Sequence, residues 1–179
     1  MLNNDLDSNQ TEVAMNTAEN DERIAGPILA LDLGRRLVGA AVSDALLISI
    51  TRLAPLRRSN WKQLLRDVHD LAIRLDAKTL VIGLPLSLNG LRGTAAMEVE
   101  KTAQNFAKSL SVPVYLQDER LTSTEAEEQL RASGHRPTQI RELVDSQAAA
   151  IILKDFIGGG QHRILVPRQV GSYSKTTTK

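Results

Sequence analysis

The sequence contains no cysteine and few aromatic residues. Trp, Tyr and Phe together make up only 3% of the 179 residues. Without cysteine there can be no disulfide, thiolate zinc site or cysteine nucleophile, so any bound metal ion must use oxygen or histidine ligands. The low aromatic content argues against binding single-stranded nucleic acid by extensive base stacking. Recognition of a nucleic acid would instead rest on phosphate contacts and shape, and it would weaken with salt.

Long apolar runs are missing as well. No apolar stretch approaches the roughly 18 residues that cross a membrane. The first ten residues, MLNNDLDSNQ, lack the apolar core of a signal peptide. These absences predict a cytoplasmic protein. The length favours a single domain, and 42% hydrophobic residues are enough for a packed core.

Acidic charge is concentrated at the amino terminus. The chain carries a net charge of +1, but residues 1–26 hold six acids and one base, a net of −5, which leaves +6 for residues 27–179. A basic body permits a nucleic-acid partner without requiring one. We expect residues 1–26 to be a disordered acidic tail, residues 27–157 to be one folded domain, and residues 158–179 to be a C-terminal tail.

Apolar patterns in the body alternate between strand and helix periods. The expected segments are strands at 27–32, 38–43, 46–53, 79–83 and 112–117 and helices at about 60–75, 94–110, 122–134 and 138–157. Short turns between the first three strands predict an antiparallel meander. A short apolar stretch at 164–166 is either one further strand or part of an ordered tail. This order predicts an α/β fold with a mixed five-stranded sheet and helices on both faces.

Acidic residues end two of the predicted strands. Asp32 follows four apolar residues of the first strand, and Gly34 leaves room for a ligand beside it. Asp118 and Glu119 follow the strand at 112–117, where alternation lets only one of them face a shared site. The carboxyl ends of strands are where α/β proteins place their sites. Taken singly, each acid could equally serve a turn or the following helix.

A third acidic position, Asp145, precedes a run of small residues. Ala148–Ala150 would let its helix approach a sheet closely, although an Asp near a helix start is usually a solvated cap. The three acidic positions lie on separate elements and can converge on one rim. Oxygen-only ligands suit Mg²⁺ or Mn²⁺, and two such ions about 4 Å apart would support phosphodiester cleavage. The sequence therefore predicts a metal-dependent nuclease.

Basic and polar residues beside these acids are candidates for substrate binding. The candidates are Arg35, Arg36, Asn89, Arg92 and Arg120. Arginine can grip a phosphate with two parallel hydrogen bonds. Any one of these arginines, taken alone, could equally be a solvated surface charge.

Four segments of the chain resemble the YqgF/RuvX-type family, whose members are described as Holliday junction resolvase-like proteins and as pre-16S ribosomal RNA nucleases. The segments are LALDLGRRLVGAAVSD (29–44), VIGLPLSLNGLRG (81–93), VYLQDERLTSTEA (114–126) and VDSQAAAIIL (144–153). With their spacers they cover about residues 27–157. The chain departs from the family pattern at Leu37, Ser87 and Asn89, which affects substrate contacts more than the acids.

The resemblance implies a ribonuclease H-like fold, a divalent metal ion and a nucleic-acid phosphodiester substrate. It also implies that Asp32, Asp145 and an acid of the Asp118-Glu119-Arg120 motif form the acidic centre. We take Asp32, Glu119 and Asp145 as candidate ligands of Mg²⁺ or Mn²⁺. Which of Asp118 and Glu119 faces the ion stays open at this point.

The leading hypothesis is an endonuclease that processes the 5′ end of pre-16S ribosomal RNA, with structured RNA and the ribosome or its precursor as partners. One alternative is a Holliday junction resolvase acting on DNA, which needs two active sites and normally a dimer. Another is a non-catalytic RNA- or ribosome-associated binding factor. A third is an ATP-using phosphotransferase of the sugar kinase and actin group, but such proteins close two domains around the nucleotide and this chain has room for one.

Overall fold

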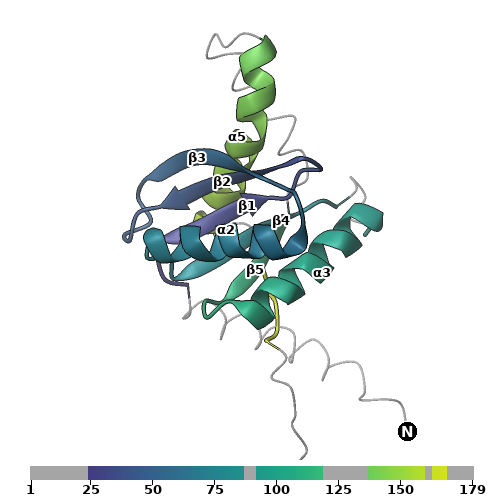
Figure 1. Ribbon diagram of the computed structural model, residues 1–179. Helices are drawn as coiled ribbons and strands as arrows, with labels where there is room; N and C mark the ends of the chain where they lie inside the picture. The colour runs from purple at the N-terminus through teal and green to yellow at the C-terminus, as the bar shows by residue number, and fades with distance from the viewer. Residues whose placement is uncertain (1–23, 87–91, 119–136, 160–162, 169–179) are drawn as a thin grey trace, which may run out of the picture.

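The fold is a mixed sheet covered by helices on both faces (Figure 1). The computed structural model describes residues 24–86, 92–118, 137–159 and 163–168, with residues 137–145 described by their backbone alone. The elements are β1 (Ile28–Asp32), β2 (Leu37–Ser43), β3 (Ile50–Arg57), α2 (Trp61–Arg74), β4 (Thr79–Leu84), α3 (Thr94–Ser109), β5 (Val114–Asp118), α5 (Pro137–Ile157) and β6 (Arg163–Leu165). The strand order is β3-β2-β1-β4-β5-β6.

The first three strands form the predicted antiparallel meander, but the third is shifted. It spans Ile50–Arg57 instead of 46–53, because residues 44–49 make a turn. The Asp44 carboxylate accepts hydrogen bonds from the backbone N–H of Ile48 (2.8 Å) and the hydroxyl of Ser49 (3.1 Å). Leu47 adopts a positive φ of 60° in this turn. The prediction of a strand from residue 46 is therefore wrong.

The second half of the sheet is parallel at its centre. β4 pairs in parallel with β1 and with β5, and all six of its residues are buried, as expected for a strand covered on both faces. β6 pairs antiparallel with β5, so residues 164 and 165 of the stretch at 164–166 belong to a sixth strand and the sheet exceeds the predicted five. This order and these directions are those of a ribonuclease H-like sheet, which confirms the predicted fold class.

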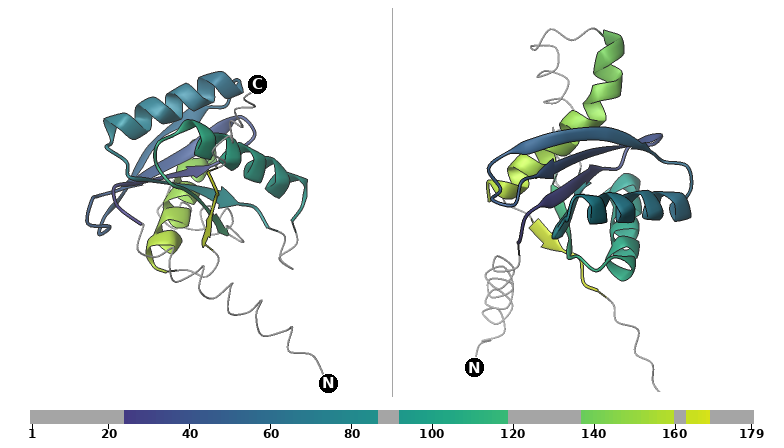
Figure 2. Two further views of the ribbon diagram at one scale, coloured as in Figure 1. Left: turned by 90° about the horizontal axis from the view of Figure 1, so that it is seen from below. Right: turned by 60° about the vertical axis from the view of Figure 1, so that its left-hand side comes forward.

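The helices cover opposite faces of the sheet (Figure 2), and one main cluster of buried residues lies on each face. On one face, α2 and α3 pack against strand residues such as Leu31, with Phe106 of α3 fully buried. On the other face, α5 packs against strand residues such as Ala30, with Phe156 fully buried. Neighbouring residues of a strand join opposite clusters because their side chains alternate. The cluster to which a residue belongs therefore tells which face it occupies.

The helix ends agree in part with the sequence predictions. Asn60 caps α2, because its side chain accepts a hydrogen bond from the backbone N–H of Gln63 (2.9 Å). α5 begins at Pro137, one residue before the predicted start at 138, and proline suits a first helical position because its missing N–H has no partner there. The helix expected at 122–134 lies outside the described residues. Within the described part of the chain, no helix combines the length and apolar character needed to span a membrane.

Candidate functional site

Asp32 lies at the carboxyl end of β1, in the interior of the sheet. Alternation along β1 places it with Ala30 on the face that α5 covers. Its partner on β2 is Gly39, and one further step along the β1–β4 ladder sets it beside Gly83. Both neighbours lack a side chain. No side chain from an adjacent strand therefore lies beside the half-buried carboxylate in this row.

Asp118 lies at the end of β5 but on the other face of the sheet. It pairs with Leu84 of β4, which belongs to the α2–α3 cluster. Gln117, one residue earlier, is on the α5 face with Asp32. Because strand side chains alternate, parity favours Glu119 over Asp118 as the partner of Asp32. Glu119 itself lies outside the described residues, so this choice stays a prediction.

Asp145 lies inside α5, as the helix predicted over 138–157 implies, and not at a capping position. Its side chain lies outside the described part, but the residues after it fix the helix to the sheet. The hydroxyl of buried Ser146 donates to the carbonyl oxygen of Leu53 (2.9 Å), and Arg52 donates to the amide oxygen of Gln147 (3.0 Å). The helix backbone is therefore tied to β3 directly after Asp145.

The loop between β1 and β2 is held by Arg58, which follows β3. The guanidinium of Arg58 donates to the carbonyl oxygens of Gly34 (3.0 Å) and Leu33 (3.5 Å). Its backbone N–H donates to the carbonyl oxygen of Arg36 (3.0 Å). Arg58 therefore fixes the loop that follows Asp32. The sequence analysis did not select this residue, because the predicted third strand ended at residue 53 and gave no reason to place Arg58 beside this loop.

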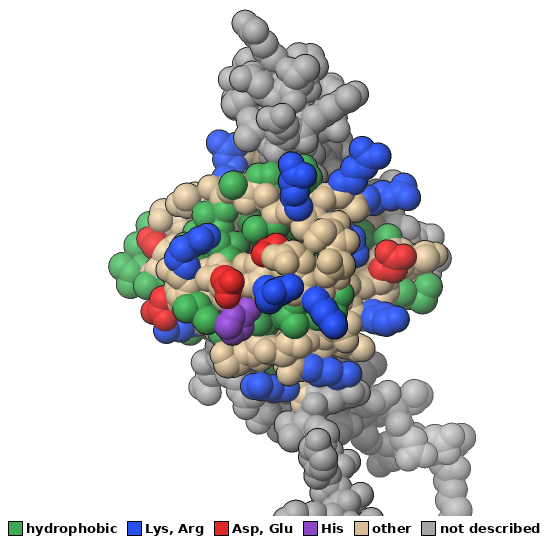
Figure 3. All heavy atoms as spheres, in the orientation of Figure 1, with side chains coloured by type: hydrophobic (Ala, Val, Ile, Leu, Met, Phe, Trp, Pro, Cys, Tyr) green, Lys and Arg blue, Asp and Glu red, His purple; other side chains and the backbone are tan. Residues whose placement is uncertain are grey.

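Two of the predicted phosphate contacts, Arg35 and Arg36, are exposed in this loop and line an open hollow of about 630 Å³. Arg57, at the neighbouring strand end, is also exposed and was not selected from the sequence. Lys and Arg side chains are spread over the whole face drawn in Figure 3, its upper rim included. This loop can therefore present positive charge beside Asp32.

The remaining basic candidates have different positions. Arg92 precedes α3 and forms an exposed ion pair with Glu100 of that helix (3.2 Å). Part of its charge is therefore already compensated, so it is a weaker candidate for phosphate than Arg35 or Arg36. Asn89 and Arg120 lie outside the described residues.

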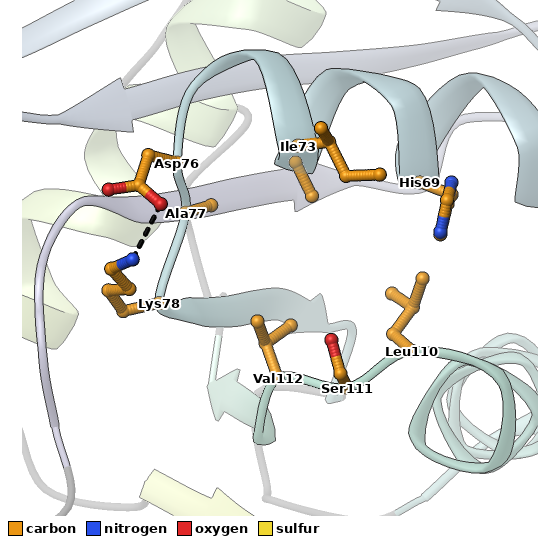
Figure 4. A pocket seen from close by; sticks show the side chains of 9 residues that line it. His69, Ile73, Asp76, Ala77, Lys78, Leu110, Ser111 and Val112 are labelled. Carbon is orange, nitrogen blue, oxygen red and sulfur yellow. Dashed lines mark hydrogen bonds and ion pairs between the residues drawn. The ribbon is translucent and has the colours of Figure 1, made fainter.

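A second hollow, of about 400 Å³, lies beside the amino ends of β4 and β5 (Figure 4), whereas Asp32 ends β1 at its carboxyl end. It lies between the end of α2 and the α3–β5 connection, and Ile73, Leu110 and Val112 give it a largely apolar lining. Its carboxylate, Asp76, forms an ion pair with Lys78. One paired carboxylate is not a site for a divalent cation, so this hollow does not compete with the rim around Asp32.

The metal centre itself stays a prediction. Within residues 24–86, 92–118, 146–159 and 163–168, no group of three or more Asp, Glu, His or Cys side chains could hold a metal ion. Of the three candidate ligands, only Asp32 has a described side chain; Glu119 and Asp145 do not. The structure thus places α5 on the face of the sheet that Asp32 occupies at the end of β1.

Comparisons with known proteins identify the family. A family model named RuvX, described as Holliday junction resolvase, matches residues 26–158. A protein of Gloeothece citriformis named "Putative pre-16S rRNA nuclease" is 43% identical over 136 residues, 76% of this chain and 89% of that protein. A protein of the same name from Chloroflexus aurantiacus is 38% identical over 130 residues, 73% of this chain and 85% of that protein.

Among solved structures, T. thermophilus RuvC in complex with a Holliday junction substrate aligns with a TM-score of 0.48 and 16% identity, over 74% of this chain and 96% of that one. The family assignment rests on the sequence matches, which span most of the chain and agree with the four motifs. The chain therefore belongs to the RuvX family.

Proposed function

We propose that the protein is a metal-dependent endonuclease that hydrolyses phosphodiester bonds in RNA, in the maturation of the 5′ end of pre-16S ribosomal RNA. One observation carries the proposal: Asp32 ends an interior strand between two glycines, on the face covered by the helix that bears Asp145. Relatives named as pre-16S ribosomal RNA nucleases support the choice of substrate. A cytoplasmic location and contact with the ribosome or its precursor are parts of the same proposal.

The donor set fits a hard divalent cation. Asp32, Glu119 and Asp145 would hold Mg²⁺ or Mn²⁺ through carboxylate oxygens, which are the ligands that these ions prefer. A bound divalent cation would lower the pKa of a coordinated water and neutralise charge on the phosphate. In this proposal, the role of the fold is to keep the carboxylates on one face of the sheet and to leave space beside Asp32 for the reacting phosphate.

The loop after β1 would bind the RNA backbone on either side of the scissile bond. Arg35 and Arg36 are exposed there and can each offer two parallel hydrogen bonds to a phosphate. Arg58 would keep the loop in place through its backbone contacts. Binding by such charge contacts should weaken steeply as salt rises.

A cleavage assay with two substrates tests the proposal. The purified protein is incubated with a precursor transcript of 16S ribosomal RNA and with a four-way DNA junction, each with Mg²⁺, Mn²⁺ or EDTA, and the ends of the products are mapped. We expect cleavage on the 5′ side of the RNA that requires the cation. Tight RNA binding without cleavage under every cation condition would overturn the nuclease proposal and favour a binding factor.

A Holliday junction resolvase is the second candidate, favoured by the description of the family model. A four-way junction is two-fold symmetric, so paired cleavage needs two active sites and normally a dimer. Light scattering on the protein with and without the junction measures this directly. A dimer that cuts the junction at symmetric positions would favour the resolvase, whereas a monomer that cuts only RNA would exclude it.

A further inference from the structure

Positive charge in the folded body is concentrated in one part of the chain. Residues 35–66 hold seven bases and one acid, a net of +6. Residues 27–179 also carry a net of +6, so the rest of the body has no net charge. The single acid, Asp44, lies in the turn before the amino end of β3. The carboxyl end of β3 and the elements beside it are therefore strongly basic.

Three elements meet at the carboxyl end of β3. Arg57, the last residue of β3, pairs with Leu37 at the start of β2. The backbone N–H of Arg58 donates to the carbonyl oxygen of Arg36 (3.0 Å), which joins the loop between β1 and β2 to the strand end. α2 begins shortly afterwards, at Trp61. The β1–β2 loop, the end of β3 and the first turns of α2 therefore form one corner of the molecule (Figure 1).

Five exposed cations cover this corner, and we call them the basic corner: Arg35, Arg36, Arg57, Lys62 and Arg66. Lys62 and Arg66 lie about one helical turn apart, or about 6 Å along the axis of α2, on the side opposite its buried residues. Among the described residues, none of the five forms an ion pair with an acid. Their charge is therefore available to an anionic ligand.

The basic corner leads away from Asp32 around the edge of the sheet. Leu56 packs against the α2–α3 cluster, so alternation places Arg57 on the other face, with Asp32. Lys62 and Arg66 lie on the outer side of α2, which covers the first face. β3 is the edge strand between them. A nucleic acid that reaches Asp32 would therefore meet these cations beyond the scissile bond.

We propose that the basic corner binds the phosphate backbone of a double-stranded arm of the RNA, next to the segment that is cut. The inference rests on the proposed function for the choice of RNA, and it deepens that function by naming the class of substrate.

Two features favour a duplex over a single strand at the basic corner. Trp61 is the only aromatic residue of 35–66, and it packs edge to face against Phe106, so base stacking has little to use. A double helix carries about twice the phosphate density of one strand. Arg58 holds the loop and a helix carries Lys62 and Arg66, so the cations form a fixed array that suits the regular backbone of a duplex.

Binding of labelled nucleic acid in EDTA tests this surface without cleavage. The probes are an RNA hairpin with a stem of about 16 base pairs, a DNA hairpin of the same sequence and an unstructured RNA of the same length. Fluorescence anisotropy gives the dissociation constants at several salt concentrations. We expect the RNA hairpin to bind more tightly than the unstructured RNA. Lys62→Gln/Arg66→Gln should bind the hairpin about tenfold more weakly, with a slope of log affinity against log salt shallower by about two.

Two further double variants keep the test decisive. Arg74→Gln/Lys108→Gln removes the same charge at the far ends of α2 and α3, and hairpin binding should weaken by less than about twofold because these sites are distant and screened. Lys62→Arg/Arg66→Lys keeps both charges and should bind as the unmodified protein does. All four substituted side chains are exposed, so the melting temperature should not change.

The outcomes distinguish this inference from the proposed function. Equal affinity for the RNA hairpin and the unstructured RNA, or equal losses in the test and control variants, would overturn the role of the basic corner alone. Tighter binding of the DNA hairpin would overturn the choice of RNA, and the proposed function with it. Hairpin binding that depends on Lys62 and Arg66, without cleavage in Mg²⁺ or Mn²⁺, would support the basic corner and overturn the nuclease proposal.

Discussion

The two faces of the sheet are built from different kinds of residues. The α2–α3 face is filled by large apolar side chains, including Leu64, Val68 and Phe106. The α5 face also buries large residues near the amino ends of its strands. Toward the carboxyl ends of the strands, the residues on this face are small or polar, as where Gly83 pairs with Gln117. Large apolar side chains pack tightly and exclude water, whereas glycines leave space and polar groups need partners. Stability and chemistry are therefore expected to depend on different faces.

Loss of the carboxylate at Asp32 should have the largest effect of any single change. Asp32→Asn keeps the shape of the side chain but removes a charged cation ligand, so we expect cleavage to fall by about a thousandfold or more. Single-turnover cleavage of the RNA precursor is the measurement.

The matched control for this change is Asp70→Asn, an exposed acid of α2 on the other face. It should leave both cleavage and stability unchanged. Full activity in purified Asp32→Asn protein would remove the basis for assigning chemistry to the α5 face.

The opposite pattern is expected for Phe106, at the centre of the α2–α3 face. Its side chain is fully buried and meets Trp61 edge to face, with ring centroids 4.9 Å apart. Phe106→Ala should lower the free energy of unfolding by about 3–5 kcal/mol, since it leaves a cavity and loses the aromatic contact. Urea unfolding measures the loss. Cleavage per folded molecule at low temperature should be unchanged.

Met97→Ala on the same helix is the control, because Met97 is 56% exposed and its removal should change stability by less than about 0.5 kcal/mol. A strong loss of cleavage in folded Phe106→Ala protein would show that the two faces are not separable in this way.

Replacement of Arg58 tests whether the loop after β1 supports the chemistry of the α5 face. Arg58→Ala removes the side-chain hydrogen bonds to Leu33 and Gly34, so the loop should loosen and cleavage should fall about tenfold, or about 1.4 kcal/mol. If Arg58 acts by positioning, the loss falls mainly on kcat. A direct phosphate contact would instead raise KM, and such a result would contradict the positioning role. Arg74→Ala, at the exposed end of α2, is the matched control.

Local patterns explain which parts of the fold were predictable. The apolar run before Asp32, the buried strand at 79–83 and the start of the helix near residue 60 depend on residues close together in sequence, and the structure has all three. The predicted start of the third strand was wrong for a related reason. Leu46 and Ile48 extended the apolar pattern, yet they are 77% and 80% exposed. The side chain of Asp44 accepts a hydrogen bond from the backbone N–H of Ile48 and so stabilises a turn there, which the pattern of hydrophobic residues alone does not predict.

The features that could not be predicted from the sequence depend on contacts between residues far apart in the chain. Arg58 contacts a loop 24 residues earlier, and no local period marks such a partner. The position of Gln117 beside Gly83 depends on the register between two strands separated by a helix. Asp32 was identifiable because it ends an apolar strand, but the face that it occupies, and the opposite face of Asp118, follow only from the ladders. Chemistry was therefore easier to predict than the side chains that position it.

Asp44 gives the smallest expected effect, because it is an acid of the same motif as Asp32 with a purely structural place at the other end of the sheet. The hydrogen bond from the backbone N–H of Ile48 lowers the pKa of Asp44 below its ordinary value of 3.8, with smaller contributions from Ser49 and Leu47. A pKa lowered by folding means that the stabilisation is present above the unfolded-state value and is lost as pH falls through the folded-state value.

Asp44→Asn should therefore melt slightly below the unmodified protein at pH 7, and the difference should shrink as pH falls below 3.8. Melting curves across this range measure it, with cleavage at pH 7 unchanged. A difference in melting temperature that stays constant with pH would mean that the charge of Asp44 contributes nothing to the turn, and a loss of cleavage would mean that acids at both ends of the sheet serve the reaction.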